Sequence, residues 1–233
     1  MKLENLKEEL KKAGVDLPDL DIDKLRTYAA LLKEWNEKIN LTSIVEEDDV
    51  AEKHFLDSLL PCALTDFSNK KIVDIGSGAG FPGMVIALAF PTSQVTLVDS
   101  TQKKFLFLEE VKKTLQISNV FFKIGRVEDM KVEKQSFDLV TSRGFSSLPT
   151  FLEVGAPLCK IDGQLIAMRG SKGKEELKES SNAMEILGLR YERKQATTLP
   201  SNGDIRLNYL LRKYKPTSSK YPREWAKIIK HPL

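Results

Sequence analysis

The spacing of apolar residues changes near residue 66 of this 233-residue chain. Before that point, apolar residues recur at the three- and four-residue spacing of helices in three stretches: 3–10, 25–39 and 50–59. Asp21 and the acidic run 46–49 are helix-start signals for the second and third stretches, and Pro61 is expected to end the third. Residues 1–65 are therefore predicted to form a helical N-terminal extension packed on the core.

After residue 66, short apolar runs alternate with longer amphipathic ones. The short runs predict seven strands: 70–76, 93–99, 119–125, 136–142, 163–168, 189–199 and 204–214. The longer runs predict helices between them: 80–90, 101–116, 147–159 and 172–188. Such alternation, with almost continuously apolar strands, is typical of a mainly parallel sheet covered on both faces. The expected fold class is α/β, with a doubly wound, mainly parallel, seven-stranded sheet in residues 66–213 and a tail at 214–233.

The composition indicates where the protein is located and argues against a metal site or a disulfide. With 41% hydrophobic and 30% charged residues, the chain can build a sizeable core. It has no apolar run of membrane-spanning length, and its charged amphipathic start differs from a secretion signal, so we expect a cytoplasmic protein with no membrane partner. The two cysteines, Cys62 and Cys159, are far apart and lack clustered histidines, so we expect neither a metal site nor a disulfide.

Charge is segregated along the chain. Residues 1–65 carry 15 acidic and 9 basic side chains, whereas residues 212–233 carry 7 basic side chains and a single acidic one. Tyr214, Tyr221 and Trp225 lie within this basic tail, a composition that suits contact with a phosphate backbone and stacking on bases. The composition by itself favours the alternative, a solubilising end whose aromatic residues fold onto the domain.

Gly76, Gly78 and Gly80 follow the first predicted strand and open a helix, the context in which a glycine-rich turn brings backbone close to a ligand. A nucleoside triphosphate would require a Gly-Lys-Ser/Thr run, which does not follow Gly80. A dinucleotide would require a glycine where Phe81 stands, because a ring there would crowd the pyrophosphate. Both ligand classes are disfavoured.

A ligand with an amino-acid end, a sulfonium and a ribose, as in S-adenosylmethionine, suits the carboxylates around this turn. Asp74 ends the first strand and could hold the ammonium group or a water beside the sulfonium. Asp99 ends the second strand, where doubly wound sheets place the acid that accepts the ribose hydroxyls. The less favoured alternative is that both carboxylates only cap the helices that follow.

Three further segments supply polar side chains that could reach a ligand. Residues 125–129 follow the third strand, where contact with an adenine ring and a plain surface loop are about equally plausible. Arg143 ends the fourth strand at the ligand edge of the sheet. His54 and Asp57 share one face of the third helix, so a structural hydrogen bond to the core is at least as plausible as catalysis.

Read together, these residues resemble the bacterial small-subunit ribosomal RNA guanine-N7 methyltransferase family, also called glucose-inhibited division protein B. The resemblance spans most of the chain, and the Phe-Pro extension of the glycine turn is far more specific to the family than the glycines are. It is carried by these segments: 40–43 (NLTS), 54–58 (HFLDS), 74–83 (DIGSGAGFPG), 98–100 (VDS), 126–128 (RVE), 141–143 (TSR) and 220–223 (KYPR).

The resemblance implies a class I S-adenosylmethionine-dependent methyltransferase fold and S-adenosylmethionine as cofactor, with S-adenosylhomocysteine as product. By matching position it implies these cofactor-binding residues: Asp74, Gly76, Ser77, Gly78, Phe81, Asp99, Ser100, Val127, Glu128 and Arg143. It also implies four arginines for the catalytic and RNA side: Arg143, Arg126, Arg206 and Arg169. Arg169-Gly170 departs from the family's usual Lys-Gly, and because lysine and arginine are not equivalent an essential role for Arg169 is in doubt.

The implied reaction is methyl transfer to N7 of one guanine of 16S rRNA. Guanine N7 carries a free lone pair, so in-line attack on the methyl group needs no general base, and the work of the enzyme is positioning of an exposed or flipped base. The expected partner is 16S rRNA or an assembly intermediate of the small ribosomal subunit, and the chain is expected to be a monomer. A nicotinamide-dependent oxidoreductase on the same sheet and a non-catalytic RNA-binding protein are the alternatives.

Overall fold

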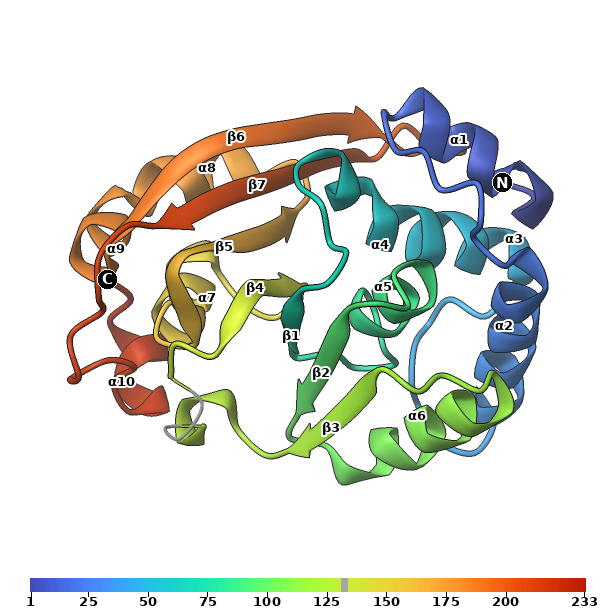
Figure 1. Cartoon of the computed structure of the whole chain (residues 1–233), viewed down its shortest axis with the longest axis horizontal. Coiled ribbons are helices and arrows are strands. Elements are labelled where there is room, and N and C mark those ends of the chain that lie inside the picture. The colour runs from blue at the N-terminus through green and yellow to red at the C-terminus, as the bar shows by residue number, and fades with distance from the viewer. Residues whose placement is uncertain (131–133) are drawn as a thin grey trace.

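The structure is a computed structural model that describes residues 1–130 and 134–233, except for the side chain of Asp129. Seven strands form one sheet in the order β3-β2-β1-β4-β5-β7-β6. The strands from β3 to β5 in this order are parallel, and β7 runs antiparallel to both β5 and β6. Their bounds are β1 Lys71–Ile75, β2 Gln94–Asp99, β3 Val120–Ile124, β4 Phe137–Arg143, β5 Cys159–Arg169, β6 Leu189–Thr198 and β7 Ile205–Lys213. The predicted α/β class with a mainly parallel seven-stranded sheet is confirmed (Figure 1).

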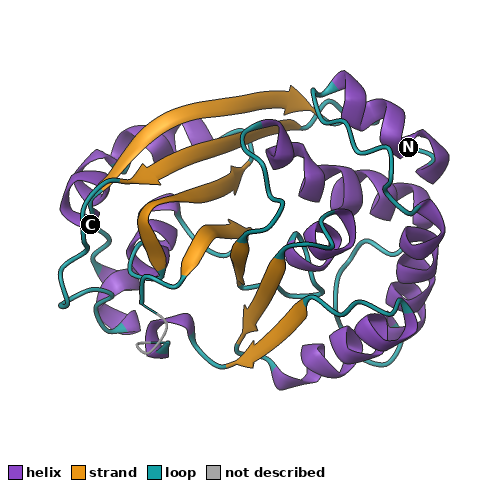
Figure 2. Cartoon of the chain, in the orientation of Figure 1, coloured by secondary structure: helices purple, strands orange, loops and turns teal. Residues whose placement is uncertain are grey.

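Helices cover both faces of this sheet (Figure 2). The α-helices are α1 Leu6–Lys12, α2 Ile22–Asn36, α3 Glu47–Val50, α4 Asp57–Leu59, α5 Gly83–Ala89, α6 Gln102–Thr114, α7 Leu148–Gly155, α8 Gly173–Glu179, α9 Ser181–Leu187 and α10 Trp225–Lys230. The shorter 3-10 and π segments are η1 Leu3–Asn5, η2 Ala51–Leu56, η3 Leu60–Ala63 and η4 Val127–Asp129. The predicted helix over 172–188 is two helices, because the chain bends at Ser180 between α8 and α9.

Successive side chains along the central strands point to opposite faces of the sheet and pack into two separate hydrophobic cores. On β1, Ile72 packs into one core and Val73 into the other, and on β4 Leu139 and Val140 divide in the same way. This period of two is the strand geometry expected for a sheet buried on both faces. The first core also contains the N-terminal helices with α5 and α6, and the second contains residues of α7, α9 and α10.

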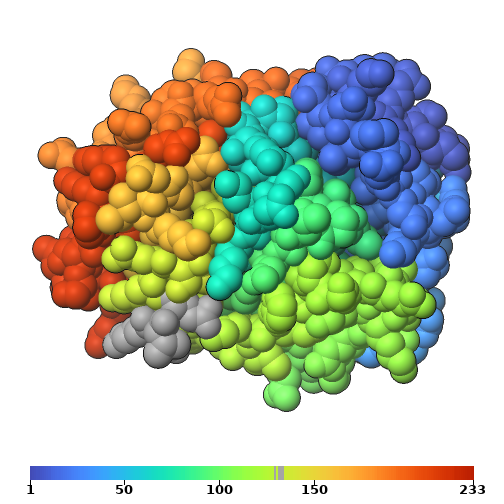
Figure 3. Space-filling view, in the orientation of Figure 1, coloured from blue at the N-terminus to red at the C-terminus, as the bar shows by residue number. Residues whose placement is uncertain are grey.

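The N-terminal helices lie against the α5 and α6 side of the sheet. Leu3, Leu6 and Leu10 are fully buried there, and Asp21 accepts a hydrogen bond from the backbone of Lys24 at 3.0 Å, which caps α2. In Figure 3 this segment is blue and lies against the green part of the chain. Packing on the core is thus observed, while the division into parts at 1–65, 66–213 and 214–233 stays a prediction.

The third helical stretch continues further than predicted. Its α-helical part ends with α4 at Leu59, just before Pro61 as predicted, and the 3-10 segment η3, which contains Pro61, adds one turn. Proline is tolerated in the first turn of the 3-10 segment because the N–H that it lacks has no partner there. None of the helices within the described residues is both long and apolar enough to cross a membrane.

The basic tail folds onto the domain. Tyr221 is 6% exposed and Ile228 is fully buried in the core beneath α7, whereas Tyr214 is exposed. The tail therefore follows the alternative favoured by its composition, with Tyr221 and Trp225, but not Tyr214, packed against the protein.

Candidate active site

The glycine turn is fastened to the second strand by its backbone. After β1 ends at Ile75, the amides of Gly76 and Ser77 both donate to the carbonyl of Val98, at 2.8 and 3.0 Å. Gly76 has a φ of +71°, and a Cβ at this position would lie 2.6 Å from the Phe145 ring. Glycine is thus required here both by the backbone conformation and by the close approach of Phe145.

Asp99 lies directly beside the turn at the end of β2. Its carboxylate accepts hydrogen bonds from the amides of Gly78 and Thr101, both at 2.9 Å, and from Lys104 Nζ at 3.2 Å. Burial opposes ionisation, but the amide of Thr101 and the positive charge of Lys104 outweigh it and hold the pKa of Asp99 below its ordinary value. An ionised acceptor therefore stands at the carboxyl edge of the sheet.

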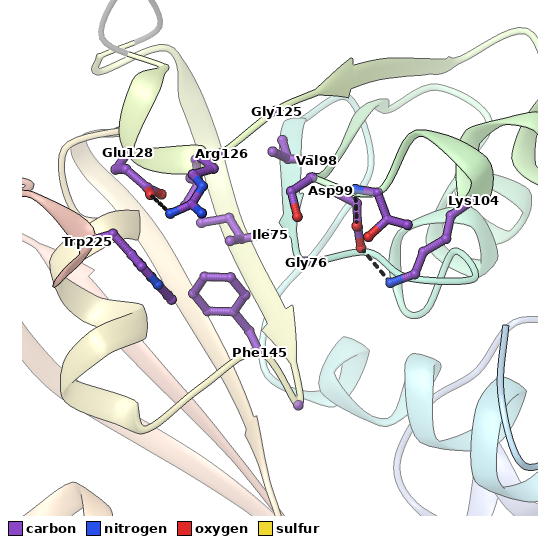
Figure 4. A pocket seen from close by; sticks show the side chains of 14 residues that line it. Ile75, Gly76, Val98, Asp99, Lys104, Gly125, Arg126, Glu128, Phe145 and Trp225 are labelled. Atoms are coloured by element: carbon purple, nitrogen blue, oxygen red, sulfur yellow. Dashed lines mark hydrogen bonds and ion pairs between the residues drawn. The ribbon is translucent and has the colours of Figure 1, made fainter. Parts of the chain in front are cut away.

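These groups border a cavity of about 360 Å³ at the carboxyl ends of β1, β2 and β4 (Figure 4). Six predicted cofactor or RNA residues line it: Gly76, Asp99, Ser100, Arg126, Val127 and Glu128. The segment after β3 is therefore part of the pocket wall, and Glu128 forms an ion pair of 3.6 Å with Arg126. The acidic residue next along, Asp129, was included in the predicted loop, but its side chain lies outside the described residues.

Asp74 lies beneath the turn, away from this cavity. It is fully buried and accepts a hydrogen bond from the Gly83 amide at 2.8 Å, at the start of α5. Its other oxygen, Oδ1, has no hydrogen-bond partner among the described residues, and burial raises the pKa of Asp74 to about 7. The carboxyl group thus makes the helix-capping contact that the sequence alone treated as the less favoured alternative.

Phe81 is the centre of an aromatic cluster and is only 5% exposed. Its ring stacks on His54 at 4.3 Å and on Tyr28 at 5.4 Å, and the Arg143 guanidinium lies 5.3 Å from its centroid. The hydroxyl of Tyr28 donates to the carbonyl of Ala79 at 2.6 Å. This cluster supports the glycine turn from below, and Phe81 is not among the residues that line the cavity.

Arg143 and Arg206 meet at one buried carboxylate. Arg143 Nη1 donates to Asp57 Oδ2 at 3.1 Å and to the carbonyl of Lys53 at 2.8 Å, while Arg206 Nε donates to Asp57 Oδ1 at 3.0 Å. Asp57 is only 4% exposed, and because its two oxygens each accept from one arginine it holds both guanidinium groups in place. The N-terminal helical segment is thereby tied to the ends of β4 and β7.

His54 completes this cluster in its neutral form. Burial and the nearby Arg143 charge lower its pKa to about 3. Arg143 Nη2 lies 3.1 Å from Nδ1 of His54, and Thr42 Oγ1 lies 3.1 Å from Nε2. Nδ1 also lies 3.1 Å from the Lys53 carbonyl, but that carbonyl already accepts from Arg143 Nη1 at 2.8 Å. Because arginine only donates, Nδ1 is assigned as the acceptor for Arg143 Nη2 and Nε2 as the protonated nitrogen. The structural hydrogen bond considered from the sequence is thus present, and it joins the helix to Arg143.

Arg169 stands apart from the other three arginines. Its guanidinium donates to the carbonyl of Ser146 and forms an ion pair with Glu176 at 3.3 Å, and its side chain is 8% exposed. Both contacts tie the end of β5 to neighbouring segments, so the geometry gives Arg169 a structural position.

Sequence reasoning missed several side chains of the cavity, among them Lys104, Phe145 and Trp225. Lys104 could have been found from its place in the first turn of the helix after Asp99, and Phe145 from its closeness to Arg143 in the sequence. Trp225 comes from the tail, and no spacing relates it to the glycine turn. Only the folded chain brings it to the pocket.

Known proteins share this sequence and fold. The sequence pattern of the GidB family, described as rRNA small subunit methyltransferase G, matches residues 21–201. Two relatives from Staphylococcus aureus, strains bovine RF122 and JH9, are each named Ribosomal RNA small subunit methyltransferase G. Each is 39% identical to this chain over 236 residues, covering 100% of this chain and 99% of the relative.

Solved structures show the same fold at low sequence identity. An S-adenosylmethionine-dependent methyltransferase from Aquifex aeolicus is similar with a TM-score of 0.56 at 16% identity, over 77% of this chain and 98% of that one. The YcgJ protein from Bacillus subtilis gives a TM-score of 0.55 at 16% identity, over 71% of this chain and 100% of that one. These likenesses confirm the class I methyltransferase fold, and the sequence match shows that the chain belongs to the rRNA small subunit methyltransferase G family.

Proposed function

We propose that this protein transfers the methyl group of S-adenosylmethionine to N7 of one guanine in 16S rRNA, by direct in-line attack and without a general base. That the chain is an S-adenosylmethionine-dependent rRNA methyltransferase follows from its family. The guanine, the atom N7 and the roles of individual residues are the proposal. The observation that carries it is the cavity at the carboxyl edge of the sheet, where Gly76, Asp99 and Glu128 meet.

The side chains and amides around this cavity fit the proposed cofactor. Gly76 borders the cavity with backbone alone, and Asp99 presents an ionised carboxylate suited to two ribose hydroxyls. Val127 and Glu128 offer an apolar surface and an acceptor for the amino group of adenine. When bound, S-adenosylmethionine supplies an electrophilic methyl group on its sulfonium. Ser77, Gly78 and Ser100 belong to the same turn region, and Asp74 and Phe81 would act by supporting it.

The titrating groups near the arginine cluster agree with a reaction that removes no proton beforehand. His54, whose pKa is lowered to about 3, is neutral at pH 7, but its Nδ1 faces the Arg143 guanidinium and is not free to accept another proton. Guanine N7 offers its lone pair without deprotonation. The protein's task is therefore to position the base in line with the methyl group.

The arginines supply the proposed RNA side of the site. The side chain of Arg126 is 61% exposed at the cavity, so it can reach a phosphate or a base edge. Arg143 and Arg206 lie together through Asp57 and keep partial exposure, at 19% and 20%. We propose free 16S rRNA or a small-subunit assembly intermediate as partner, in the cytoplasm, with the protein acting as a monomer.

The test is methyl transfer with S-adenosylmethionine carrying a labelled methyl group. Deproteinised 16S rRNA and small-subunit particles, both from cells without the gene, are offered in parallel, and the labelled nucleotide is mapped. Label at N7 of one guanine supports the proposal, and the better substrate of the two identifies the partner. Label at another atom, or none on either substrate, contradicts it. An Asp99→Asn variant that methylates as well as the unaltered protein would contradict the role given to Asp99.

Ligand binding distinguishes this function from the nicotinamide alternative. S-adenosylhomocysteine should raise the melting temperature, because a ligand that binds only the folded state stabilises it by mass action. NADH is the matched control and should leave the melting temperature unchanged, since Phe81 replaces the glycine that a dinucleotide turn requires.

A further inference from the structure

Trp225 lines the same cavity as the glycine turn, although it lies in the tail. It is the first residue of α10, and in Figure 4 its indole stands next to Phe145 on the side of the cavity formed by Arg126 and Glu128. The Trp225 and Phe145 ring centroids are 5.7 Å apart, with their planes tilted by 58°. Phe145 in turn packs against Gly76. The aromatic wall, defined as Phe145 and Trp225, is therefore continuous with the turn.

Contacts on both sides of Trp225 hold it in this position. Two residues before it, Arg223 donates from its backbone amide and from Nε to Glu153 Oε1, at 3.0 and 2.7 Å, and from Nη2 to Oε2 at 2.6 Å. Glu153 is fully buried in α7. Three residues after Trp225, Ile228 is fully buried as well. A guanidinium that binds a buried carboxylate through both oxygens fixes the direction in which the chain enters α10.

The chemistry beside the aromatic wall is that of a site for a flat heterocycle. Val127 is 5% exposed and adds an apolar surface, while Glu128 can accept a hydrogen bond from an exocyclic amino group. Asp99 and Lys104 lie on the opposite side of the cavity, at the position proposed for the ribose (Figure 4). A nucleoside with its sugar at Asp99 would thus direct its base toward the aromatic wall.

We propose that Trp225 is a binding residue for the adenine ring of the cofactor, and that the tail completes the cofactor site through it. This inference rests on the proposed function, since it takes S-adenosylmethionine as the ligand. The indole provides a π-surface beside the base, an interaction with a typical strength of roughly 5- to 100-fold in affinity. The basic tail, whose composition also suits RNA contact, thus contributes Trp225 to cofactor binding.

The test measures S-adenosylhomocysteine binding by calorimetry on the full-length protein without RNA. Trp225→Leu should weaken binding by roughly 5- to 100-fold, and Trp225→Phe should restore most of it because it keeps an aromatic face. Thermal unfolding without ligand verifies that both variants fold, which is expected because Arg223 and Ile228 continue to hold the tail. Binding by Trp225→Leu equal to that of the unaltered protein would overturn the proposal, and so would loss of binding that Phe does not restore.

Fluorescence gives a second readout, because the chain has two tryptophans. The other one, Trp35, packs on Phe107 at 6.0 Å and does not line the cavity. In Trp35→Phe protein, S-adenosylhomocysteine should change the emission of Trp225, whereas in Trp225→Phe protein the emission of Trp35 should stay constant. Constant Trp225 emission at saturating ligand would overturn the proposal. If the unaltered protein does not bind S-adenosylhomocysteine at all, the proposed function itself fails, which is a different outcome.

Discussion

Replacing Asp57 by asparagine should weaken both the fold and the reaction. The carboxylate of Asp57 joins Arg143 and Arg206 at 3.1 and 3.0 Å. Removing one partner of a buried ion pair typically costs about 3–5 kcal/mol. Since the two arginines keep 19% and 20% exposure, water offsets part of that loss, and we expect a destabilisation of about 2–3 kcal/mol. For a domain of this size that lowers the melting temperature by roughly 5–10 °C.

Urea denaturation and initial rates of methyl transfer measure the two effects. Asp57→Asn keeps the shape of the side chain but not its charge, so Arg206 loses its strongest anchor while Arg143 retains the Lys53 carbonyl. The matched control is Asp49→Asn, because Asp49 pairs with Lys53 on the same helical segment but at the surface, and its loss should change little. Unaltered stability together with an unaltered rate in Asp57→Asn would refute the view that this carboxylate positions the arginines.

Three further predictions concern the turn and its surroundings. Phe81→Ala should destabilise the protein by about 3–5 kcal/mol and weaken S-adenosylhomocysteine binding, because the aromatic cluster loses its central ring. Calorimetry measures both the unfolding free energy and the binding affinity. Unchanged stability would contradict the buried position of Phe81. Asp74 has a pKa near 7 in the folded protein and an ordinary value of 3.8, so the unfolded chain releases this proton first and the stability due to Asp74 falls as pH rises from about 4 to 7. The stability of Asp74→Asn relative to the unaltered protein should therefore increase as pH rises over this range, by up to about 4 kcal/mol. Urea titrations of both proteins at pH 4.5 and 7.5 measure this difference. A difference that does not change with pH would refute the shifted pKa. Arg126→Ala should raise the KM for RNA, since this side chain is exposed at the cavity, and should leave the melting temperature and S-adenosylhomocysteine affinity nearly unchanged. Equal KM values for the variant and the unaltered protein would argue against RNA contact.

The sequence was sufficient for the elements and for bringing several predicted residues to one cavity. Alternating apolar runs predicted seven strands, and seven form the sheet. Gly76 and Asp99 could be placed together because the ends of neighbouring parallel strands meet at one edge of a doubly wound sheet. The tail illustrates the opposite case, since its composition allowed both RNA contact and folding onto the domain.

Other features depend on contacts between distant parts of the chain. Asp74 and Asp99 both end strands and look alike in sequence, but Asp74 is fully buried under α5 while Asp99 faces the cavity with Lys104. Phe81 belongs to the glycine turn in the sequence, and only the fold shows that Tyr28 and His54, from the first 65 residues, enclose its ring. Burial and partner charge decide these differences, and neither is encoded by local spacing.

By itself, then, the sequence determined the α/β class, the glycine turn and the carboxylate beside it, because these depend on residue periods of two and 3.6 and on the fixed geometry of a βα unit. The tertiary structure alone decided that Asp57 joins Arg143 and Arg206, and that Trp225 reaches the pocket. Such contacts join residues far apart in the chain, whose meeting is set by how helices and strands pack and not by any local pattern.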